Sequence, residues 1–213
     1  MSFFVIYRTE LAAMAKNVPT GPYNDDLFSA LNLPMGLLVS FPSLTGLEGA
    51  PRGLALLFAA CLMVLLAVRI ARSLANPTLK AAFASLPDKD AVILIMGAAL
   101  ISGCFLTGQS VGYRGIYLIL VIAGMISMRR VADDGPTRSI LLNTAIIAVL
   151  LMWEGFFRTQ VSVLSLNIQF FVWLVKELLW WWLIGQLLGV LAIFGLHSNV
   201  FNAISRRPSK TWT

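Results

Sequence analysis

Few side chains in this chain have the types and positions that chemistry in a membrane requires. Arg114 precedes one long apolar stretch, whereas Glu154 and Arg158 follow another. Glu154 and Arg158 are four residues apart, so on a helix they can form an ion pair. An ionisable group at membrane depth is costly and is by default a functional candidate. We interpret the three residues as a buried ion pair or as a site that binds lipid phosphate.

The depth of these residues follows from counting about 20 residues from the cytoplasmic end of each helix, the length that crosses a bilayer. By this count Arg114 and Glu154 both lie at the level of the outer leaflet, so a pair between two helices is an alternative to the local pair with Arg158. The arginines can also extend to lipid phosphates, with Glu154 pairing with one of them. The sequence leaves these alternatives open.

Five tryptophans fall at a similar level, four of them around the adjacent charges Lys176 and Glu177. Tryptophan is enriched where membrane meets water because its ring is amphipathic. We therefore predict an interface belt, and an aromatic platform for a substrate is the alternative. The belt residues are Trp153, Trp173, Trp180, Trp181 and Trp182.

Two glycines in the last apolar stretch, Gly185 and Gly189, are separated by three residues. This spacing lets two helix backbones approach closely, because no side chain intervenes. We predict a helix-packing face at these two positions.

The overall composition places these residues in a membrane protein. Of the 213 residues, 58% are hydrophobic and 12% are charged, whereas a soluble domain has about 45–50% apolar and about 25% charged residues. The formal net charge is +6, but the basic residues occur in ones and twos at the ends of apolar stretches. A nucleic-acid partner is therefore not expected, since such binding needs a basic patch or stripe.

The remaining reactive side chains give no sign of a metal or a cofactor. Cys61 and Cys104 both lie inside apolar stretches and are expected to be small buried hydrophobic residues. His197 is the only histidine, so neither a metal site nor a histidine-based catalytic triad is predicted. We expect no cofactor.

Five apolar stretches are candidates for membrane-spanning helices, since about 20 apolar residues cross the bilayer core. Ten of the sixteen Lys and Arg residues follow the first, third and fifth stretches, and five lie on the opposite side. Positive charge favours the cytoplasmic side, so the N-terminus is predicted outside and the C-terminus inside. The predicted fold is all-α, a polytopic membrane helix bundle with about five transmembrane helices. The apolar cores are Gly53–Val68, Ala91–Leu106, Ile116–Met128, Ile140–Met152 and Phe170–Leu196.

This topology divides the chain into three parts. Residues 1–52 form an extracytoplasmic segment, residues 53–198 the transmembrane bundle and residues 199–213 a cytoplasmic tail. An apolar piece within the first part, residues 31–39, is too short to span and is expected at the interface or packed on the bundle. An outer segment of this length without a signal peptide is expected where a chain continues from an earlier span or needs a partner for insertion.

The stretch GQSVGYRGIYLIL, residues 108–120, resembles a segment in the later spans of GT-C type membrane glycosyltransferases, in which a Tyr-Arg pair opens an apolar helix. The segment YNDDLFSALNLP, residues 23–34, also looks like an outer loop of such proteins. The resemblance covers about residues 1–130 and matches a C-terminal portion. It implies a sugar linked to polyprenyl phosphate and an outward-facing active site. The family's catalytic acid lies after an initial span that this chain lacks.

Three functions remain in competition. The first is a non-catalytic transmembrane subunit of a larger assembly in a bacterial inner membrane, with membrane lipids and other transmembrane subunits as partners. The second, implied by the resemblance, is a glycosyltransferase in which Asp25 or Asp26 acts as general base and Arg114 and Arg158 hold the carrier phosphate. The third is a transporter component, which would need mid-membrane charges and broken helices. The subunit is favoured, because the sequence contains no recognisable catalytic constellation.

Overall fold

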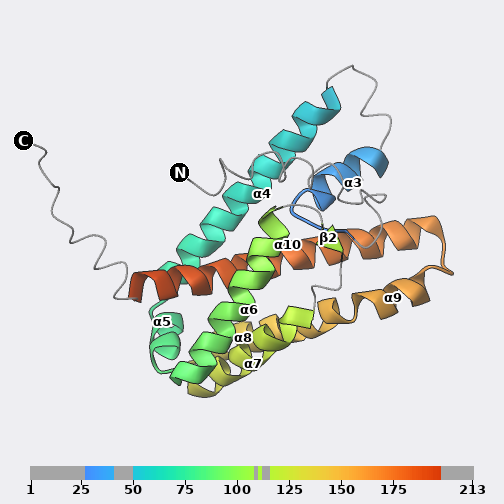
Figure 1. Cartoon of the computed structure of the whole chain (residues 1–213). Coiled ribbons are helices and arrows are strands. Elements are labelled where there is room, and N and C mark those ends of the chain that lie inside the picture. Colours follow the sequence, from blue (N-terminus) through green and yellow to red (C-terminus); the bar gives the residue numbers. More distant parts are fainter. Residues whose placement is uncertain (1–26, 41–49, 108–109, 112–115, 198–213) are drawn as a thin grey trace, which may run out of the picture.

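The computed structural model describes residues 27–40, 50–107, 110–111 and 116–197. This part of the chain contains eight helices and two strands of two residues each (Figure 1), which confirms the predicted all-α helix bundle. In chain order the elements are β1 (Leu27–Phe28), α3 (Asn32–Ser40), α4 (Ala50–Ala75), α5 (Pro77–Ala84), α6 (Asp88–Thr107), β2 (Ser110–Val111), α7 (Leu118–Val131), α8 (Gly135–Met152), α9 (Glu154–Val161) and α10 (Leu166–His197).

Four of these helices, α4, α6, α8 and α10, are long and apolar enough to cross a membrane. The chain is therefore an integral membrane protein, as the composition predicts. Helix α7 coincides with the third predicted span but has only 14 residues. It packs between α6 and α8.

Helices α4 and α10 run in the same sense where they cross. Leu66 and Arg69 of α4 lie beside Gly185 of α10, and Ser73, farther along α4, lies beside Gly189, farther along α10. If both helices cross the membrane, an odd number of crossings must lie between them, and the predicted span at α7 would supply the third. That α7 crosses stays a prediction, since four helices among the described residues are long and apolar enough to span and α7, with 14 residues, is not one of them.

Helices α6 and α7 are antiparallel and approach closely at two glycines. A Cβ atom on Gly124 of α7 would lie 2.9 Å from the Cα atom of Leu94, and one on Gly97 of α6 would lie 3.0 Å from the backbone nitrogen of Val121. Position 94 therefore opposes 124 and position 97 opposes 121, which makes the two helices antiparallel. Both glycines are needed for this close approach, because any side chain would meet the neighbouring backbone.

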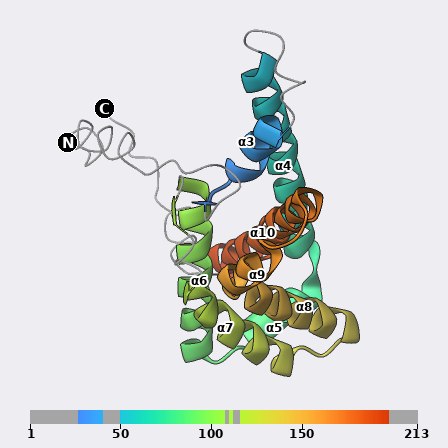
Figure 2. The same ribbon diagram turned by 90° about the vertical axis from the view of Figure 1, so that its right-hand side faces the viewer.

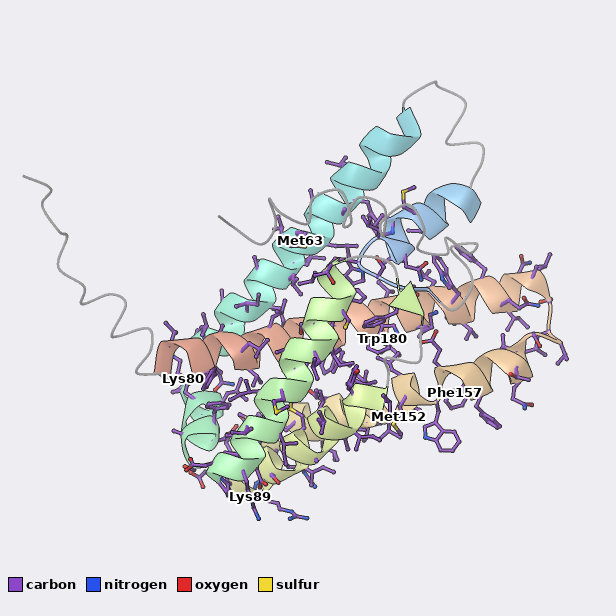
Figure 3. All side chains as sticks on the ribbon, viewed as in Figure 1. Met63, Lys80, Lys89, Met152, Phe157 and Trp180 are labelled. Carbon is purple, nitrogen blue, oxygen red and sulfur yellow. The ribbon has the colours of Figure 1, made fainter. Side chains whose placement is uncertain are left out.

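Two helix starts are capped by side chains at one end of the bundle. The Asn76 side chain accepts a hydrogen bond from the backbone N–H of Leu79 at the start of α5, and Asp134 accepts one from Thr137 at the start of α8. A proline stands in the first turn of each helix, where no N–H partner is lost. Figure 3 shows Lys80 and Lys89 at this end, away from α3. These are residues of the predicted cytoplasmic side.

The other end of the bundle is closed by the short elements. Helix α3 packs on α4 and α10, with Leu33 fully buried. The apolar piece 31–39 therefore packs on the bundle, which is one of the two placements predicted for it. Strands β1 and β2 pair antiparallel, with Leu27 opposite Val111. The Phe28 ring then contacts the rings of Phe105 and Trp180, at centroid distances of 5.3 and 4.5 Å. These contacts fix α3 against the middle of α10.

Helix α10 is the centre of the molecule. It lies against α3, α4, α5, α6, α8 and α9, and Figure 2 views it nearly along its axis, with α4, α6 and α8 around it. Its inner positions Leu183, Ile184, Leu187 and Ile193 are fully buried. Residues carried by α10 are therefore presented to most of the bundle.

Candidate functional site

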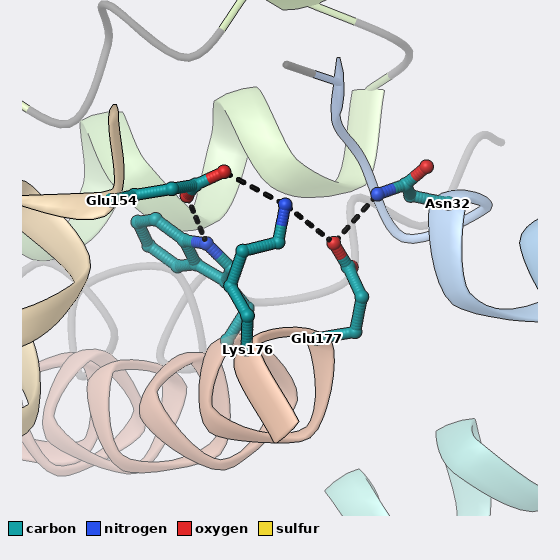
Figure 4. A network of polar contacts seen from close by, with 5 residues as sticks. Asn32, Glu154, Lys176 and Glu177 are labelled. Carbon is teal, nitrogen blue, oxygen red and sulfur yellow. Dashed lines mark hydrogen bonds and ion pairs between the residues drawn. The ribbon is translucent and has the colours of Figure 1, made fainter. Parts of the chain in front are cut away.

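Three charged side chains meet where α9 approaches α10. Lys176 of α10 places its Nζ atom 2.7 Å from Oε1 of Glu154 on α9 and 3.2 Å from Oε1 of Glu177. The ammonium group therefore lies between two carboxylates (Figure 4). Lys176 and Glu154 are 17% and 18% exposed, whereas the Glu177 side chain is only 2% exposed.

Neutral hydrogen-bond donors anchor this cluster on both sides. The Asn32 Nδ2 atom of α3 donates to Oε1 of Glu177 at 2.6 Å, and the Trp180 indole nitrogen donates to Oε2 of Glu154 at 3.2 Å. We call Asn32, Glu154, Lys176, Glu177 and Trp180 the polar network. It links α3, α9 and α10 at the end of the bundle that is predicted to face outward.

The charges of the polar network do not balance. With every group ionised, two carboxylates face one ammonium, and one negative charge is left over. A buried charge is tolerated only when it is paired and hydrogen-bonded. Lys176 is paired with both carboxylates and so meets this requirement. The Glu154 carboxylate lies at the more accessible edge of the network.

A cavity of about 630 Å³ opens beside the polar network, between α8, α9 and the first turns of α10. Its apolar wall includes Leu151, Phe157 and Trp173, and its polar wall includes Glu154 and Lys176. Its volume falls within the range of pockets that bind small molecules, about 300–1,000 Å³. The cavity can therefore hold an amphipathic molecule whose polar end meets the Glu154–Lys176 pair.

Among the described side chains Glu154 pairs with Lys176, and its predicted pairs with Arg114 or Arg158 stay predictions. Arg158 lies on α9, as expected for a residue four positions after Glu154, but its side chain is not described. Arg114, Asp25 and Asp26 lie outside the described residues. Lys176 and Glu154 are 22 residues apart in the sequence. Counting residues along the predicted spans placed both near the outer membrane boundary but did not predict that they pair.

Three of the five belt tryptophans pack inside the protein. Trp173, Trp180 and Trp181 are buried, so these rings are covered by protein, and their place at the depth of the membrane interface stays a prediction. Their rings pack on α3, β1 and α6, with Trp181 5.3 Å from the Phe105 ring. An indole ring suits a core and an interface equally well. Trp153 is more than half exposed, and its place in a belt stays a prediction.

The two glycines predicted as a helix-packing face lie against α4 of the same chain. A Cβ atom on Gly189 would lie 2.6 Å from Oγ of Ser73, and one on Gly185 would lie 3.1 Å from Cγ of Arg69. The Arg69 guanidinium lies 5.5 Å from the centre of the Trp182 ring. With the Gln186 amide turned so that its oxygen faces α4, this oxygen accepts hydrogen bonds from Arg69. The glycine face is thus occupied within the chain rather than open to a partner.

Sequence reasoning missed Lys176 as the centre of the site. Two opposite charges side by side within a 27-residue apolar stretch were a usable signal, because such charges are expensive unless a third group completes the network. Among the described residues, no three His, Cys, Asp or Glu side chains lie close enough together to hold a metal ion.

Comparisons with known proteins add no relatives. No family model matches the chain, and neither a curated protein nor a solved structure is significantly similar to it.

Proposed function

We propose that the chain is a non-catalytic transmembrane subunit of a larger assembly in a bacterial inner membrane. The observation that carries this proposal is an apolar projection at the outer end of the bundle. It consists of α9, the turn 162–165 and the first turns of α10, and we call it the outer hairpin. Figures 1 and 2 show α9 and the start of α10 side by side, beyond the other long helices.

The outer hairpin carries the most exposed of the large apolar side chains among the described residues, in a place where a loop is normally polar. Val163 is 84% and Leu166 81% exposed, and Phe156 and Phe171 are more than half exposed. The turn itself is well ordered by hydrogen bonds, since the Gln169 amide donates to the carbonyl oxygens of Ser162 and Leu164. A rigid tip that presents apolar side chains is the composition expected of an interaction surface.

The length of α10 supports the same proposal. The helix has 32 residues, whereas about 20 residues cross the hydrocarbon core. The surplus falls at the hairpin end if the Lys- and Arg-rich end is held at the cytoplasmic surface. Apolar residues beyond the lipid need protein to cover them, and another transmembrane subunit supplies it.

Site-specific photocrosslinking in intact cells tests the proposal. A photoreactive amino acid at Leu166 is expected to give a discrete protein adduct, and the same protein should co-purify at fixed stoichiometry in mild detergent. The matched control is Leu65, which is 64% exposed on α4 and should crosslink only to lipid. Lipid adducts at both positions, together with a protein that purifies alone, would overturn the subunit role.

A further inference from the structure

The polar groups that line the cavity have used up most of their hydrogen-bond donors. Thr159 donates its hydroxyl proton to the Gly155 carbonyl oxygen at 3.0 Å, and Ser162 donates to that of Thr159 at 2.7 Å. Gln169 uses its Nε2 atom for two backbone carbonyl oxygens, at 3.2 and 2.8 Å. Each of these side chains retains an oxygen that can accept, but no free proton.

The Glu154–Lys176 pair in the cavity wall adds more free hydrogen-bond acceptors than free donors. Each Glu154 oxygen accepts one hydrogen bond, from Lys176 or Trp180, and a carboxylate has about four lone-pair sites. Lys176 directs two of its three protons to Glu154 and Glu177, so one proton remains. The indole nitrogen of Trp173, another lining residue, has no hydrogen-bond partner among the described residues. A ligand that fits these groups must therefore donate several hydrogen bonds and can accept at most two, from Lys176 and Trp173.

The charge of the polar network adds a second requirement. Among the described side chains, two carboxylates face one ammonium when all three groups are ionised, so a cationic ligand group beside Glu154 would complete the charge balance. A primary ammonium meets both requirements, since it is positively charged and carries three donor protons. A phosphate or carboxylate would meet neither.

The apolar wall shows from which direction the ligand arrives. Leu150, Phe157 and Val175 line the cavity and are 43%, 43% and 38% exposed, so the cavity is open on its apolar side. This opening lies at the base of the outer hairpin, where α8 and α10 are expected to meet lipid, whereas the tip of the hairpin extends beyond it. A molecule that enters by this route has hydrocarbon next to its polar group.

We propose that this cavity binds a membrane lipid with a primary ammonium head group, an aminophospholipid, with the ammonium at Glu154 and a chain along Leu150, Phe157 and Val172. This site does not depend on the subunit role, because the hydrogen-bonding groups and the charge of the cavity alone select the ligand class.

Native mass spectrometry of the purified full chain with equimolar dioleoyl lipids tests the proposal. The probes are phosphatidylethanolamine, phosphatidylcholine, which keeps the positive charge but has no N–H donor, and phosphatidylglycerol, which has hydroxyl donors but no cation. Charge-assisted hydrogen bonds are about twice as strong as neutral ones, so at least about fivefold more phosphatidylethanolamine than phosphatidylcholine should bind. Equal binding of these two lipids, or more phosphatidylglycerol than phosphatidylethanolamine, would overturn the proposal.

Two variants locate the binding within the cavity. Glu154→Gln should reduce the preference for phosphatidylethanolamine to less than about twofold, since it removes the charge that the ammonium meets. Val172→Trp fills the apolar wall without removing any member of the polar network and should reduce binding of all three lipids. Leu178→Trp is the matched control, because Leu178 lies on the same helix outside the cavity lining and is half exposed. Val172→Trp and Leu178→Trp with the same lipid binding would contradict the site, even if Glu154→Gln failed to fold.

Discussion

The two halves of α10 are held in the bundle by opposite means. The half near Gly185 and Gly189 packs on α4 through small residues and fully buried aliphatic side chains. The half near Lys176 and Glu177 is held by ions and hydrogen bonds and borders a cavity. Close packing leaves no room for a ligand. The polar network, in contrast, borders a cavity, and its Glu154 carboxylate can still accept further hydrogen bonds. The comparison separates a structural half from a half suited to binding.

The largest effect is expected from Lys176→Met, which leaves the buried Glu177 and the partly buried Glu154 carboxylates without their shared cation. Removal of one partner from a buried ion pair costs about 3–5 kcal/mol of unfolding free energy. Unfolding by sodium dodecyl sulfate in mixed micelles measures the loss. Lys89→Met is the control, since Lys89 is exposed at the opposite end. A triple variant that adds Glu154→Gln and Glu177→Gln should recover much of the stability, and no recovery would show that the network acts through something other than charge.

The next effect concerns the packed half. Gly189→Leu is expected to lower the unfolding free energy by about 1–3 kcal/mol, because overfilling a packed contact forces neighbours to move. Its Cβ atom alone would lie 2.7 Å from Cβ of Ser73. Gly103→Leu in α6 is the control, since no described atom lies within 4 Å of a Cβ built there. Equal unfolding midpoints for the two variants would mean that α4 and α10 are not in close contact.

A smaller effect separates the two buried indoles near the cavity. Trp180→Phe loses a hydrogen bond to a carboxylate, worth about 1.5–3 kcal/mol, whereas the Trp173 indole nitrogen has no hydrogen-bond partner among the described residues. Trp173→Phe should therefore cost less than Trp180→Phe in the same unfolding assay. The reverse order would indicate that Trp180 contributes by ring packing alone.

The smallest effect is a pH dependence of stability from Asp134, which caps the start of α8. The backbone N–H of Thr137 donates to Asp134 and lowers the pKa of its carboxyl. Since the folded-state pKa is depressed, this contribution is present above the unfolded-state pKa and is lost as pH falls through the folded-state value. Wild type should therefore lose stability on acidification relative to Asp134→Asn, which keeps the cap without the charge. Parallel pH profiles for the two proteins would contradict the role of the carboxylate.

The sequence was a good guide to the crossing helices and to their order. Residues 91–106 and 170–196 lie inside α6 and α10, and Pro77 and Pro136 stand in the first turn of α5 and α8, where local rules expect them. Helix length and apolar composition are local properties, so they can be read without knowing the neighbours. The short helices α5 and α9 and the β1–β2 pair were not predicted, because segments of two to eight residues depend on what they pack against.

The site was only half predictable, for a reason that its residues make clear. Glu154 was recognised from its depth, and Lys176 and Glu177 were placed at the same level. Which charge pairs with which depends on the rotation of α9 against α10, and a linear sequence does not specify that rotation. The same limit explains Trp181, whose amphipathic ring could face lipid or the core until a neighbour such as Phe105 is known.

The parallel contact between α4 and α10 also has a consequence for biosynthesis. Ser73 and Gly189 meet across more than 100 intervening residues, so α4 is made long before its main partner helix exists. During translation the Ser73 face of α4 has no helix to cover it until α10 is made. The helices synthesised in between, α6, α7 and α8, pack mainly on one another and on α10. A contact this distant in sequence forms late, and assembly of the bundle ends when the last helix leaves the insertion machinery and docks between α4 and α6.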